Sequence, residues 1–341
     1  MHPTLSVRGV NIFNRSVLSK MFMIRLPMFL AVGMRKFTQS GYRRASAGFE
    51  KEDLNKNMKG KVAMVTGGNQ GIGYAASLSL AKLGFTVHVV CRNAERGKDA
   101  VEKLKSESGN PNIQLSVCDV SSLSDIKRLA AEYVTSGQPL HVLVNNAGVM
   151  VDWAQSADGF EINFATNTLG SYAMARAFEQ VLKRSSPSRV IFVASGGALT
   201  ESLVVDDMEG NLLKRDKNFG QVQYARDKRR QLVITEQLAK EWADSGVDVY
   251  AMHPGWVDTH GVQSSMPDFR ARFQSSLRTL DEGADTIVWL SVQTREKLES
   301  GGFYLDRSPQ SKHLLLSGTS YSEKDARDLM EKLDAMVSKT H

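Results

Sequence analysis

Cysteine is scarce in this sequence of 341 residues, which has only Cys91 and Cys118. Their spacing fits neither a metal-binding motif nor the disulfide framework of a secreted protein. We therefore interpret both as reduced, buried thiols and expect no metal site. A chain of this length can bury a sufficient core without disulfide bonds.

Acidic residues are absent from residues 1–49, although this segment has eight of the 43 lysines and arginines. The rest of the chain is nearly neutral, with 35 basic and 37 acidic residues, so the net charge of +6 belongs to the N-terminal extension. Because a charged tail of this kind is not a basic binding face, we expect no nucleic-acid partner.

The N-terminal extension also lacks an apolar run long enough to span a bilayer. Met21–Val32 is mostly apolar, but it is too short and is interrupted by Arg25 and Pro27. An acid-free segment rich in Arg and Ser is typical of a mitochondrial transit peptide, and we slightly favour this interpretation and a mitochondrial location. Two alternatives stay open: a segment in peripheral contact with a membrane, and an extension without a targeting role in a cytoplasmic protein.

From Lys61 onward, short apolar runs alternate with longer amphipathic segments. The apolar runs are typical of strands buried on both faces: Val62–Thr66, Thr86–Cys91, Ile113–Cys118, His141–Asn145, Val190–Ser195, Val247–His253 and Phe303–Leu305. Helical patterns lie between them at 71–83, 93–107, 121–135, 160–183, 224–244 and 283–293. This alternation predicts a single α/β domain with a Rossmann-type, doubly wound parallel sheet flanked by helices.

We expect an N-terminal extension at 1–57, the α/β domain at 58–310, and a C-terminal tail at 311–341 with an amphipathic helix at 322–338. Two segments interrupt the alternation: 196–223 is polar and irregular, and 256–280 is a candidate lid. In the candidate lid, apolar residues recur at helical spacing and either pack in the core or line an apolar pocket: Val262, Met266, Phe269, Phe273 and Leu277.

A glycine-rich turn follows the first expected strand and opens the first expected helix, with the sequence Thr66-Gly67-Gly68-Asn69-Gln70-Gly71-Ile72-Gly73. Glycines let the backbone approach a pyrophosphate closely, and a helix N-terminus offers its N–H groups to the phosphates. We therefore expect a dinucleotide to contact the residues of this turn: Gly67, Asn69, Gln70, Gly71, Ile72 and Gly73.

The second expected strand ends at Cys91-Arg92-Asn93, without the acid that would accept hydrogen bonds from the adenosine ribose of NAD(H). The planar guanidinium of Arg92 suits the 2′-phosphate of NADP(H), and an ordinary surface arginine is the alternative. We predict a preference for NADP(H), with NAD(H) as the second choice.

Tyr224 and Lys228 lie four residues apart at the start of an expected helix, so they share one face of it. Other polar and small residues stand where expected strands end: Asn145-Asn146-Ala147-Gly148, Ser195, and Pro254-Gly255 with Thr259 close behind. Asn167 lies within the expected helix 160–183. Because the carboxyl ends of parallel strands lie along one edge of a sheet, we expect these residues to converge.

Together, these motifs resemble the short-chain dehydrogenase/reductase family over about residues 58–306. Within the family, four stretches are most similar to the subgroup called dehydrogenase/reductase member 12, which is related to retinol-dehydrogenase-like enzymes: Val65–Gly73, Phe164–Gly170, Ser195-Gly196-Gly197 and Met252–Thr259. The resemblance implies an oxidoreductase that interconverts a carbonyl and an alcohol with NAD(P)(H), with a lipophilic small molecule as substrate. It also implies a homodimer through helices 160–183 and 224–244.

The resemblance implies a role for each residue. Tyr224 would be the general acid or base, Ser195 would hydrogen-bond the substrate oxygen, and Lys228 would bind the nicotinamide ribose and lower the pKa of Tyr224. Asn167 would hold a water that connects Lys228 to solvent. Further expected cofactor contacts are Asp119 and Asn145 at the adenosine half, Ala147, Gly148, Pro254 and Gly255 at strand ends, and Thr259 at the nicotinamide carboxamide.

Three features depart from the family pattern. Asp227 stands before the lysine where Ser or Ala is usual, Ala194 replaces a frequent serine, and Ser195 and Tyr224 are 29 residues apart. The alternative to an enzyme is a dinucleotide-binding sensor or scaffold without turnover. The complete set of Ser195, Tyr224, Lys228 and Asn167 favours the enzyme.

Overall fold

The computed structural model describes residues 15–315 and 317–339, so the first fourteen residues of the N-terminal extension lie outside it. Eight strands form one sheet in the order β3-β2-β1-β4-β5-β6-β7-β8. The first seven strands run parallel, and β8 pairs antiparallel with β7. Their bounds are Val62–Thr66 (β1), Thr86–Cys91 (β2), Ile113–Val117 (β3), Val142–Asn145 (β4), Ser188–Val193 (β5), Val247–Met252 (β6), Phe303–Leu305 (β7) and Ser308–Pro309 (β8).

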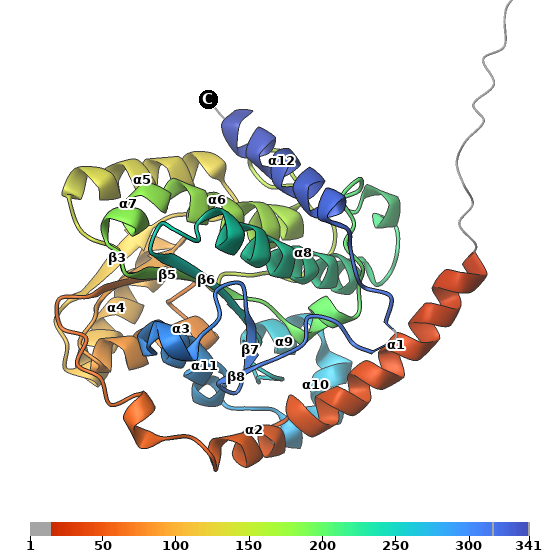
Figure 1. Cartoon of the computed structure of the whole chain (residues 1–341), viewed down its shortest axis with the longest axis horizontal. Coiled ribbons are helices and arrows are strands. Elements are labelled where there is room, and N and C mark those ends of the chain that lie inside the picture. Colours follow the sequence, from red (N-terminus) through yellow and green to blue (C-terminus); the bar gives the residue numbers. More distant parts are fainter. Residues whose placement is uncertain (1–14, 316, 340–341) are drawn as a thin grey trace, which may run out of the picture.

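Helices cover both faces of this sheet, which confirms the expected doubly wound fold (Figure 1). On one face pack α3 (Gly71–Lys82), α4 (Ala94–Ser108) and α11 (Leu280–Val292). On the other pack α5 (Leu123–Ser136), α6 (Ser171–Ala177), α7 (Glu179–Arg184), α8 (Phe219–Glu241) and α12 (Glu323–Lys339). Strand order reverses between β1 and β4, where ligands bind in folds of this kind.

The central strands β1, β4, β5 and β6 are largely buried on both faces because each face is covered by helices. In β1 all five residues are buried, and neighbouring residues belong to different cores: Met64 to the α5–α8 side and Val65 to the α3–α11 side. The period of two in a strand sends successive side chains to opposite faces, so such strands show continuous hydrophobicity. This is why seven of the eight strands could be recognised in the sequence.

The expected helix 160–183 is interrupted. Residues Phe164–Gly170 form a π-helical segment (η2), which is followed by the separate helices α6 and α7. Apolar periodicity alone did not reveal this change of hydrogen bonding, and π-helical turns occur often at functional sites. The candidate lid is also divided, into α9 (His260–Ser265) and α10 (Pro267–Phe273), because Pro267 begins the second helix.

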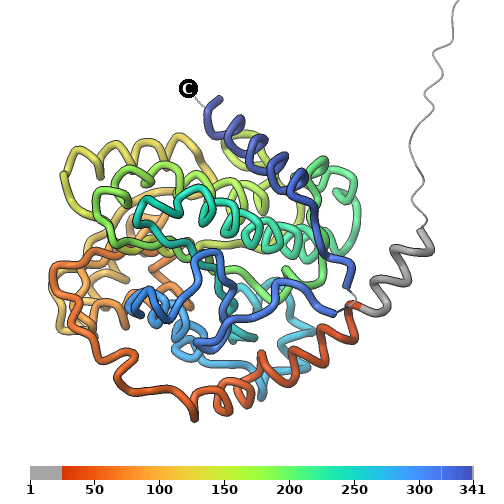
Figure 2. Tube along the Cα trace, in the orientation of Figure 1, coloured from red at the N-terminus to blue at the C-terminus, as the bar shows by residue number. Residues whose placement is uncertain are grey.

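Part of the N-terminal extension is packed on the α/β domain. After α1 (Arg15–Lys36) and α2 (Gln39–Ser46), the chain follows one edge of the molecule before it enters β1 (Figure 2). Phe37 is buried, with its ring 4.4 Å from that of His253 and 6.0 Å from that of Trp256, and its carbonyl accepts a hydrogen bond from Trp256 N at 2.7 Å. We call residues 25–49 the N-terminal arm.

These contacts bear on the transit-peptide interpretation, because a cleavage that removed all of residues 1–57 would also remove Phe37 from this core. No helix in the described part of the chain has the length and apolarity needed to cross a membrane.

The C-terminal helix α12 docks on α8, as Figure 1 shows at the top of the molecule. Its residues Ala326, Leu329 and Leu333 are fully buried, and Asp334 accepts a hydrogen bond from the hydroxyl of Tyr172 in α6 at 2.5 Å. The chain itself therefore covers part of the surface of α6 and α8, the helices for which a homodimer contact was expected.

Candidate active site

The glycine-rich turn lies between β1 and α3, beside the reversal of strand order. Gly67 and Gly71 have positive φ angles of 64° and 57°, which favour glycine. A Cβ atom at Gly73 would stand 2.2 Å from the carbonyl oxygen of Gly67, so only glycine fits this close approach of helix and turn. The turn therefore requires the residue types that a dinucleotide motif has at these positions.

The start of α3 is suited to phosphate. Gln70 is the N-cap residue, but its side chain makes no capping hydrogen bond, which leaves the first N–H groups of the helix to another acceptor. A Cβ atom at Gly71 would meet nothing within 4 Å, so the backbone there is open to a ligand. Uncapped N–H groups and the helix dipole together fit the pyrophosphate of a dinucleotide.

Asn146, which was not among the expected contacts, holds this turn against the end of β4. Its amide nitrogen donates to the carbonyl oxygen of Thr66 at 2.8 Å, and the Thr66 hydroxyl accepts from the N–H groups of Asn146 and Ala147 at 2.9 and 3.0 Å. Asn145 points elsewhere, because its amide donates to the carbonyl oxygen of Ser171 at 3.2 Å. The geometry thus favours Asn146 over Asn145 as the side chain that shapes the turn.

The expected adenosine contacts stand at the ends of β2 and β3. Arg92 is exposed, and within the described residues it forms no ion pair that would compete with a phosphate. Asp119 follows β3, and its carboxylate accepts from the N–H and hydroxyl groups of Ser121 at 2.9 and 2.7 Å. Both residues follow neighbouring strands, and their contacts with the adenosine half stay a prediction.

Ser195, which follows β5, lies beside Tyr224 and Lys228 in the first half of α8, as the sequence predicts. The Ser195 side chain hydrogen-bonds Tyr224, and it also accepts from Gly197 N at 3.1 Å. The Lys228 ammonium lies 5.3 Å from the centre of the Tyr224 ring. A phenol, a hydroxyl and an ammonium from distant parts of the sequence therefore share one site.

Gly148 packs closely against this site, because a Cβ atom there would stand 3.6 Å from Lys228 Nζ and 3.0 Å from the Asn167 side-chain oxygen. The next expected contacts are Pro254 and Gly255, after β6, and Gly255 has a φ of 82°. Thr259 caps α9, since its hydroxyl accepts from Val262 N at 3.1 Å. Its contact with a nicotinamide carboxamide stays a prediction.

The electrostatics of Tyr224 are dominated by burial. Burial raises the pKa of Tyr224 to about 12, the hydrogen bond from Ser195 acts to lower it, and the nearby charge of Asp227 acts to raise it. Burial also lowers the pKa of Lys228 to about 8, while Asp227 acts in the opposite direction. Desolvation is thus the largest influence on the phenol, and the lowering of its pKa by Lys228 stays a prediction.

Asp227 does not turn toward Tyr224. Its carboxylate is fully buried and is held by Arg230 Nη1 at 2.8 Å and the hydroxyl of Thr168 at 2.7 Å. Burial raises the pKa of Asp227, and the charge of Arg230 acts to lower it. The acid that departs from the family pattern is thus compensated by Arg230, one turn further along α8.

The side chain of Asn167 is engaged with the segment after β4. Its oxygen accepts from Val149 N at 2.9 Å and its nitrogen donates to Val149 O at 2.8 Å. The backbone carbonyl of Asn167 accepts from Gln231 Nε2 at 2.7 Å, and Gln231 Oε1 in turn accepts from Lys228 Nζ at 3.1 Å. Gln231 therefore links Lys228 to the backbone of Asn167, and sequence analysis missed this residue; the water held by Asn167 stays a prediction.

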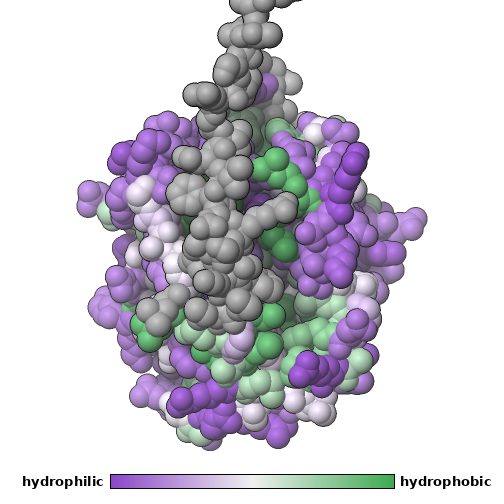
Figure 3. Space-filling view, turned by 90° about the vertical axis from the view of Figure 1, so that its right-hand side faces the viewer, coloured by the Kyte–Doolittle hydropathy of each residue, from purple (hydrophilic) through white to green (hydrophobic). Residues whose placement is uncertain are grey.

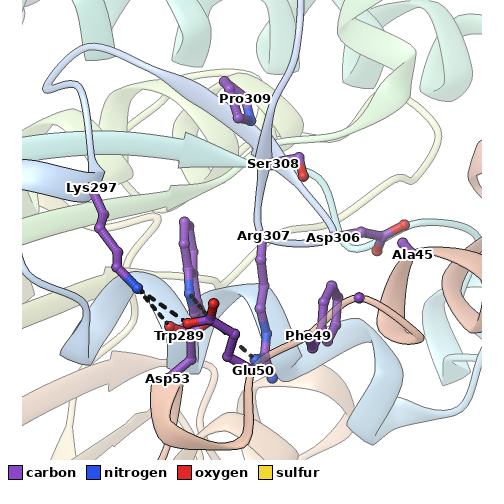
Figure 4. A pocket seen from close by; sticks show the side chains of 11 residues that line it. Ala45, Phe49, Glu50, Asp53, Trp289, Lys297, Asp306, Arg307, Ser308 and Pro309 are labelled. Carbon is purple, nitrogen blue, oxygen red and sulfur yellow. Dashed lines mark hydrogen bonds and ion pairs between the residues drawn. The ribbon is translucent and has the colours of Figure 1, made fainter.

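A cavity of about 610 Å³ lies away from this site, between the N-terminal arm and the β7–β8 turn (Figure 4). Its lining includes Phe49, Asp53, Trp289, Lys297 and Arg307 but none of the expected site residues. The charged groups in it satisfy one another: Asp53 pairs with Lys297 at 3.3 Å, and the guanidinium of Arg307 stacks 4.1 Å from the Phe49 ring. This cavity therefore lies where the N-terminal segment packs on the β7–β8 turn.

The fold and this site together define a Rossmann-type protein equipped for dinucleotide-dependent oxidation and reduction. A model of the short chain dehydrogenase family matches residues 61–205. The chain is 41% identical over 319 residues to "Dehydrogenase/reductase SDR family member 12" of Bos taurus, which covers 93% of this chain and 99% of that protein. It is 30% identical over 255 residues to "Retinol dehydrogenase 11" of Mus musculus, which covers 74% and 79% respectively.

This chain belongs to the short-chain dehydrogenase/reductase family, and it is an NAD(P)-dependent oxidoreductase. A solved structure of L-sorbose reductase from Gluconobacter frateurii, complexed with NADPH and L-sorbose, shares the fold with a TM-score of 0.59. The identity to that structure is 20%, and the match covers 73% of this chain and 96% of that one. The expected family, fold and class of enzyme are thus confirmed.

Proposed function

We propose that this enzyme interconverts a lipophilic carbonyl compound and its alcohol, prefers NADP(H), and uses Tyr224 as the general acid or base. The observation that supports this most directly is the hydrogen-bonded pair of Ser195 and Tyr224 with the Lys228 ammonium 5.3 Å from the phenol ring. When bound, the nicotinamide supplies or accepts the hydride.

In the direction of reduction, the Tyr224 hydroxyl donates its proton to the carbonyl oxygen while Ser195 holds that oxygen in place. Burial raises the pKa of the phenol and so favours the protonated form, which is the form that acts as the acid. In the reverse direction, the phenolate would accept the proton of the alcohol.

The glycine-rich turn and the start of α3 would hold the pyrophosphate, and Lys228 would bind the nicotinamide ribose. The preference for NADP(H) rests on Arg92, which is exposed at the end of β2 in a position without a neighbouring acid at the strand tip. Guanidinium and phosphate groups form paired, charge-assisted hydrogen bonds, which the ribose of NAD(H) cannot reproduce.

A lipophilic substrate is supported by two features. One is the similarity to a retinol dehydrogenase. The other is the apolar cluster beside the residue after Ser195: a Cβ atom at Gly196 would lie 2.9 Å from the Phe37 ring and 3.2 Å from that of Phe29. Trp256 extends this cluster toward α10, with its ring 5.1 Å from that of Phe269.

The molecule has apolar surface on the side where α1 and α10 lie (Figure 3). Leu26 and Met34 of α1 are exposed there, and basic residues follow at Arg35 and Lys36. Apolar side chains next to basic ones suit an anionic membrane surface, so peripheral membrane contact through the N-terminal segment remains part of the proposal. A homodimer is also part of the proposal, and its interface would use the surface of α6 and α8 that α12 leaves uncovered.

Turnover by the purified full chain tests the proposal. We expect NADPH oxidation with retinaldehyde or long-chain aldehydes and much less with sugars. The Tyr224→Phe variant should lose about 10²- to 10⁴-fold in turnover while its affinity for NADPH, measured by calorimetry, stays the same. Binding of NADPH without turnover of any aldehyde or ketone would instead support the sensor or scaffold alternative.

The cofactor preference has its own test. In the Arg92→Ala variant we expect affinity for NADPH to fall by about tenfold or more, with affinity for NADH unchanged. Arg96→Ala is the matched control, because Arg96 is an exposed arginine in the next turn of the chain. Equal losses for both cofactors, or equal losses in both variants, would contradict the role of Arg92.

A further inference from the structure

Gln231 lies one turn beyond Lys228 on α8 and is fully buried. Its side-chain oxygen accepts a hydrogen bond from Lys228 Nζ at 3.1 Å, and its nitrogen donates to the carbonyl oxygen of Asn167 at 2.7 Å. The amide thus bridges the ammonium of the site and the backbone of the π-helical segment η2. Each end of the amide has the partner that its polarity requires.

The contacts of Lys228 leave one direction free. An ammonium has three N–H donors. One of them goes to the carbonyl oxygen of Val193 at 2.7 Å and another to Gln231. Among the described residues no third acceptor contacts this ammonium, and Gly148 lies beside it, since a Cβ atom there would stand 3.6 Å from Nζ. The two acceptors therefore fix two of the three donors and leave the third for a ligand.

We propose that Gln231 is a positioning residue that fixes the Lys228 ammonium and closes the path between Lys228 and the Asn167 carbonyl to proton transfer. This inference rests on the proposed function of Lys228 beside Tyr224. A water accepts one proton and releases another, so a water in this place would conduct protons. An amide in a fixed orientation accepts at its oxygen and donates at its nitrogen without exchanging a proton between them. Tyr224, which is partly exposed, must then exchange protons with solvent without Lys228.

The bridge depends on the local backbone of η2. The carbonyl of Asn167 also accepts from the Ser171 hydroxyl at 2.7 Å, and the nitrogen of Gln231 lies 3.4 Å from the same hydroxyl. The π-helical turn thus presents its carbonyl sideways to α8, within reach of a side chain from that helix. Glutamine has the length and the two opposite polar ends that this gap requires, whereas leucine has neither donor nor acceptor.

Three substitutions separate the effects of charge, hydrogen bonding and space. Gln231→Glu places a negative charge beside the ammonium, so the pKa of Lys228 should rise by about one pH unit or more. Gln231→Leu removes an acceptor that favours the charged form, so the pKa should fall. Gln231→Ala opens space for water in a polar setting. Thr235→Val is the matched control, since Thr235 is a buried polar residue one turn further along α8.

The first readout needs neither cofactor nor turnover. The pKa of Lys228 is measured by NMR titration of the protein with isotope-labelled lysine side chains, and its signal is assigned by its loss in Lys228→Arg. We expect opposite shifts in Gln231→Glu and Gln231→Leu and no shift in Thr235→Val. If all variants titrate like the unmodified chain, Gln231 does not position the ammonium and the proposal is overturned.

The second readout is the dependence of turnover on the deuterium content of the solvent. We expect a linear dependence, from one proton in flight, in the unmodified chain and a curved one in Gln231→Ala, where water completes a longer relay. A curved dependence in the unmodified chain would refute the closed path. If Tyr224→Phe kept its turnover, the proposed function would fail, and the NMR titration would still decide the role of Gln231.

Discussion

Arg278 joins three distant parts of the chain, and its replacement gives the sharpest test of how the N-terminal arm is held. The residue is 1% exposed. Its guanidinium pairs with both carboxylate oxygens of Asp306, at 2.6 and 2.8 Å, and donates to the carbonyl oxygens of Lys36 at 2.6 Å and Phe37 at 3.0 Å. The same side chain therefore ties the arm to the turn between β7 and β8.

The Arg278→Met substitution keeps much of the volume and removes every donor. Asp306 is only 6% exposed, so its charge would be left buried and unpaired. Breaking a buried ion pair by removing one partner costs about 3–5 kcal/mol, and the carbonyl groups of the arm would lose their partners as well. We expect the free energy of unfolding to fall by about 4 kcal/mol, with residues 37–49 losing most of their protection from hydrogen exchange.

Denaturant titration and hydrogen exchange measure these two effects. Lys240→Met is the control, because Lys240 pairs with Glu323 at 2.8 Å while the two side chains are 58% and 67% exposed, and such pairs contribute about 1 kcal/mol or less. Adding Asp306→Asn to Arg278→Met should recover part of the loss, since it removes the unpaired charge and Asn tolerates the positive φ of 51°. A loss below about 1 kcal/mol in Arg278→Met would refute the argument.

Two further predictions concern stability and association. Burial lowers the pKa of His253 to about 3, below its unfolded value of about 6.5, so the unfolded chain gains a proton as pH falls through 6.5 while the folded chain does not. Between pH 7.5 and 5 the unmodified chain should therefore lose about 2 kcal/mol more stability than His253→Leu, as measured by denaturant titration at each pH. Equal losses in the two chains would contradict the burial argument. Deleting residues 321–341 removes α12 and uncovers the apolar surface of α8 on which Leu329 and Leu333 are buried. Light scattering of the shortened chain should therefore detect self-association or aggregation. A shortened chain as monodisperse as the full one would show that the uncovered surface does not promote association.

The central strands were predictable because the signal for each strand lies in its own residues. Largely apolar runs such as Val62–Thr66 and Val247–Met252 have few alternatives to a strand covered on both faces. The glycine-rich turn was predictable for a similar reason, since residues like Gly73 leave a signature where the backbone approaches too closely for a Cβ atom. Spacing alone also sufficed to bring Ser195 and Tyr224 together at one edge of the sheet.

The N-terminal arm was not predictable because its composition is misleading. Its surplus of basic residues is typical of a solvated or cleaved segment, yet Phe37 is buried and Lys36 is held through its backbone carbonyl. Hydrogen bonds from a distant arginine to backbone carbonyls leave no trace in the sequence of the segment that accepts them. Sequence analysis did not identify Gln231 for a related reason. Its contacts depend on the π-helical turn around Asn167, which hydrophobic periodicity does not reveal.

The buried charges of α8 explain how a site with these pKa values can work. Asp227 acts to raise the pKa of both Tyr224 and Lys228, and Arg230 pairs with its carboxylate at 2.8 Å. With Tyr224 near 12 and Lys228 near 8, the phenol is protonated and the ammonium largely charged at pH 7. Under the proposed role of Lys228, its ammonium favours the phenolate, so alcohol oxidation should stop rising with pH above about 8, where that charge is lost. Whatever holds the proton on Lys228, including the acceptor oxygen of Gln231, therefore sets the upper limit of that reaction.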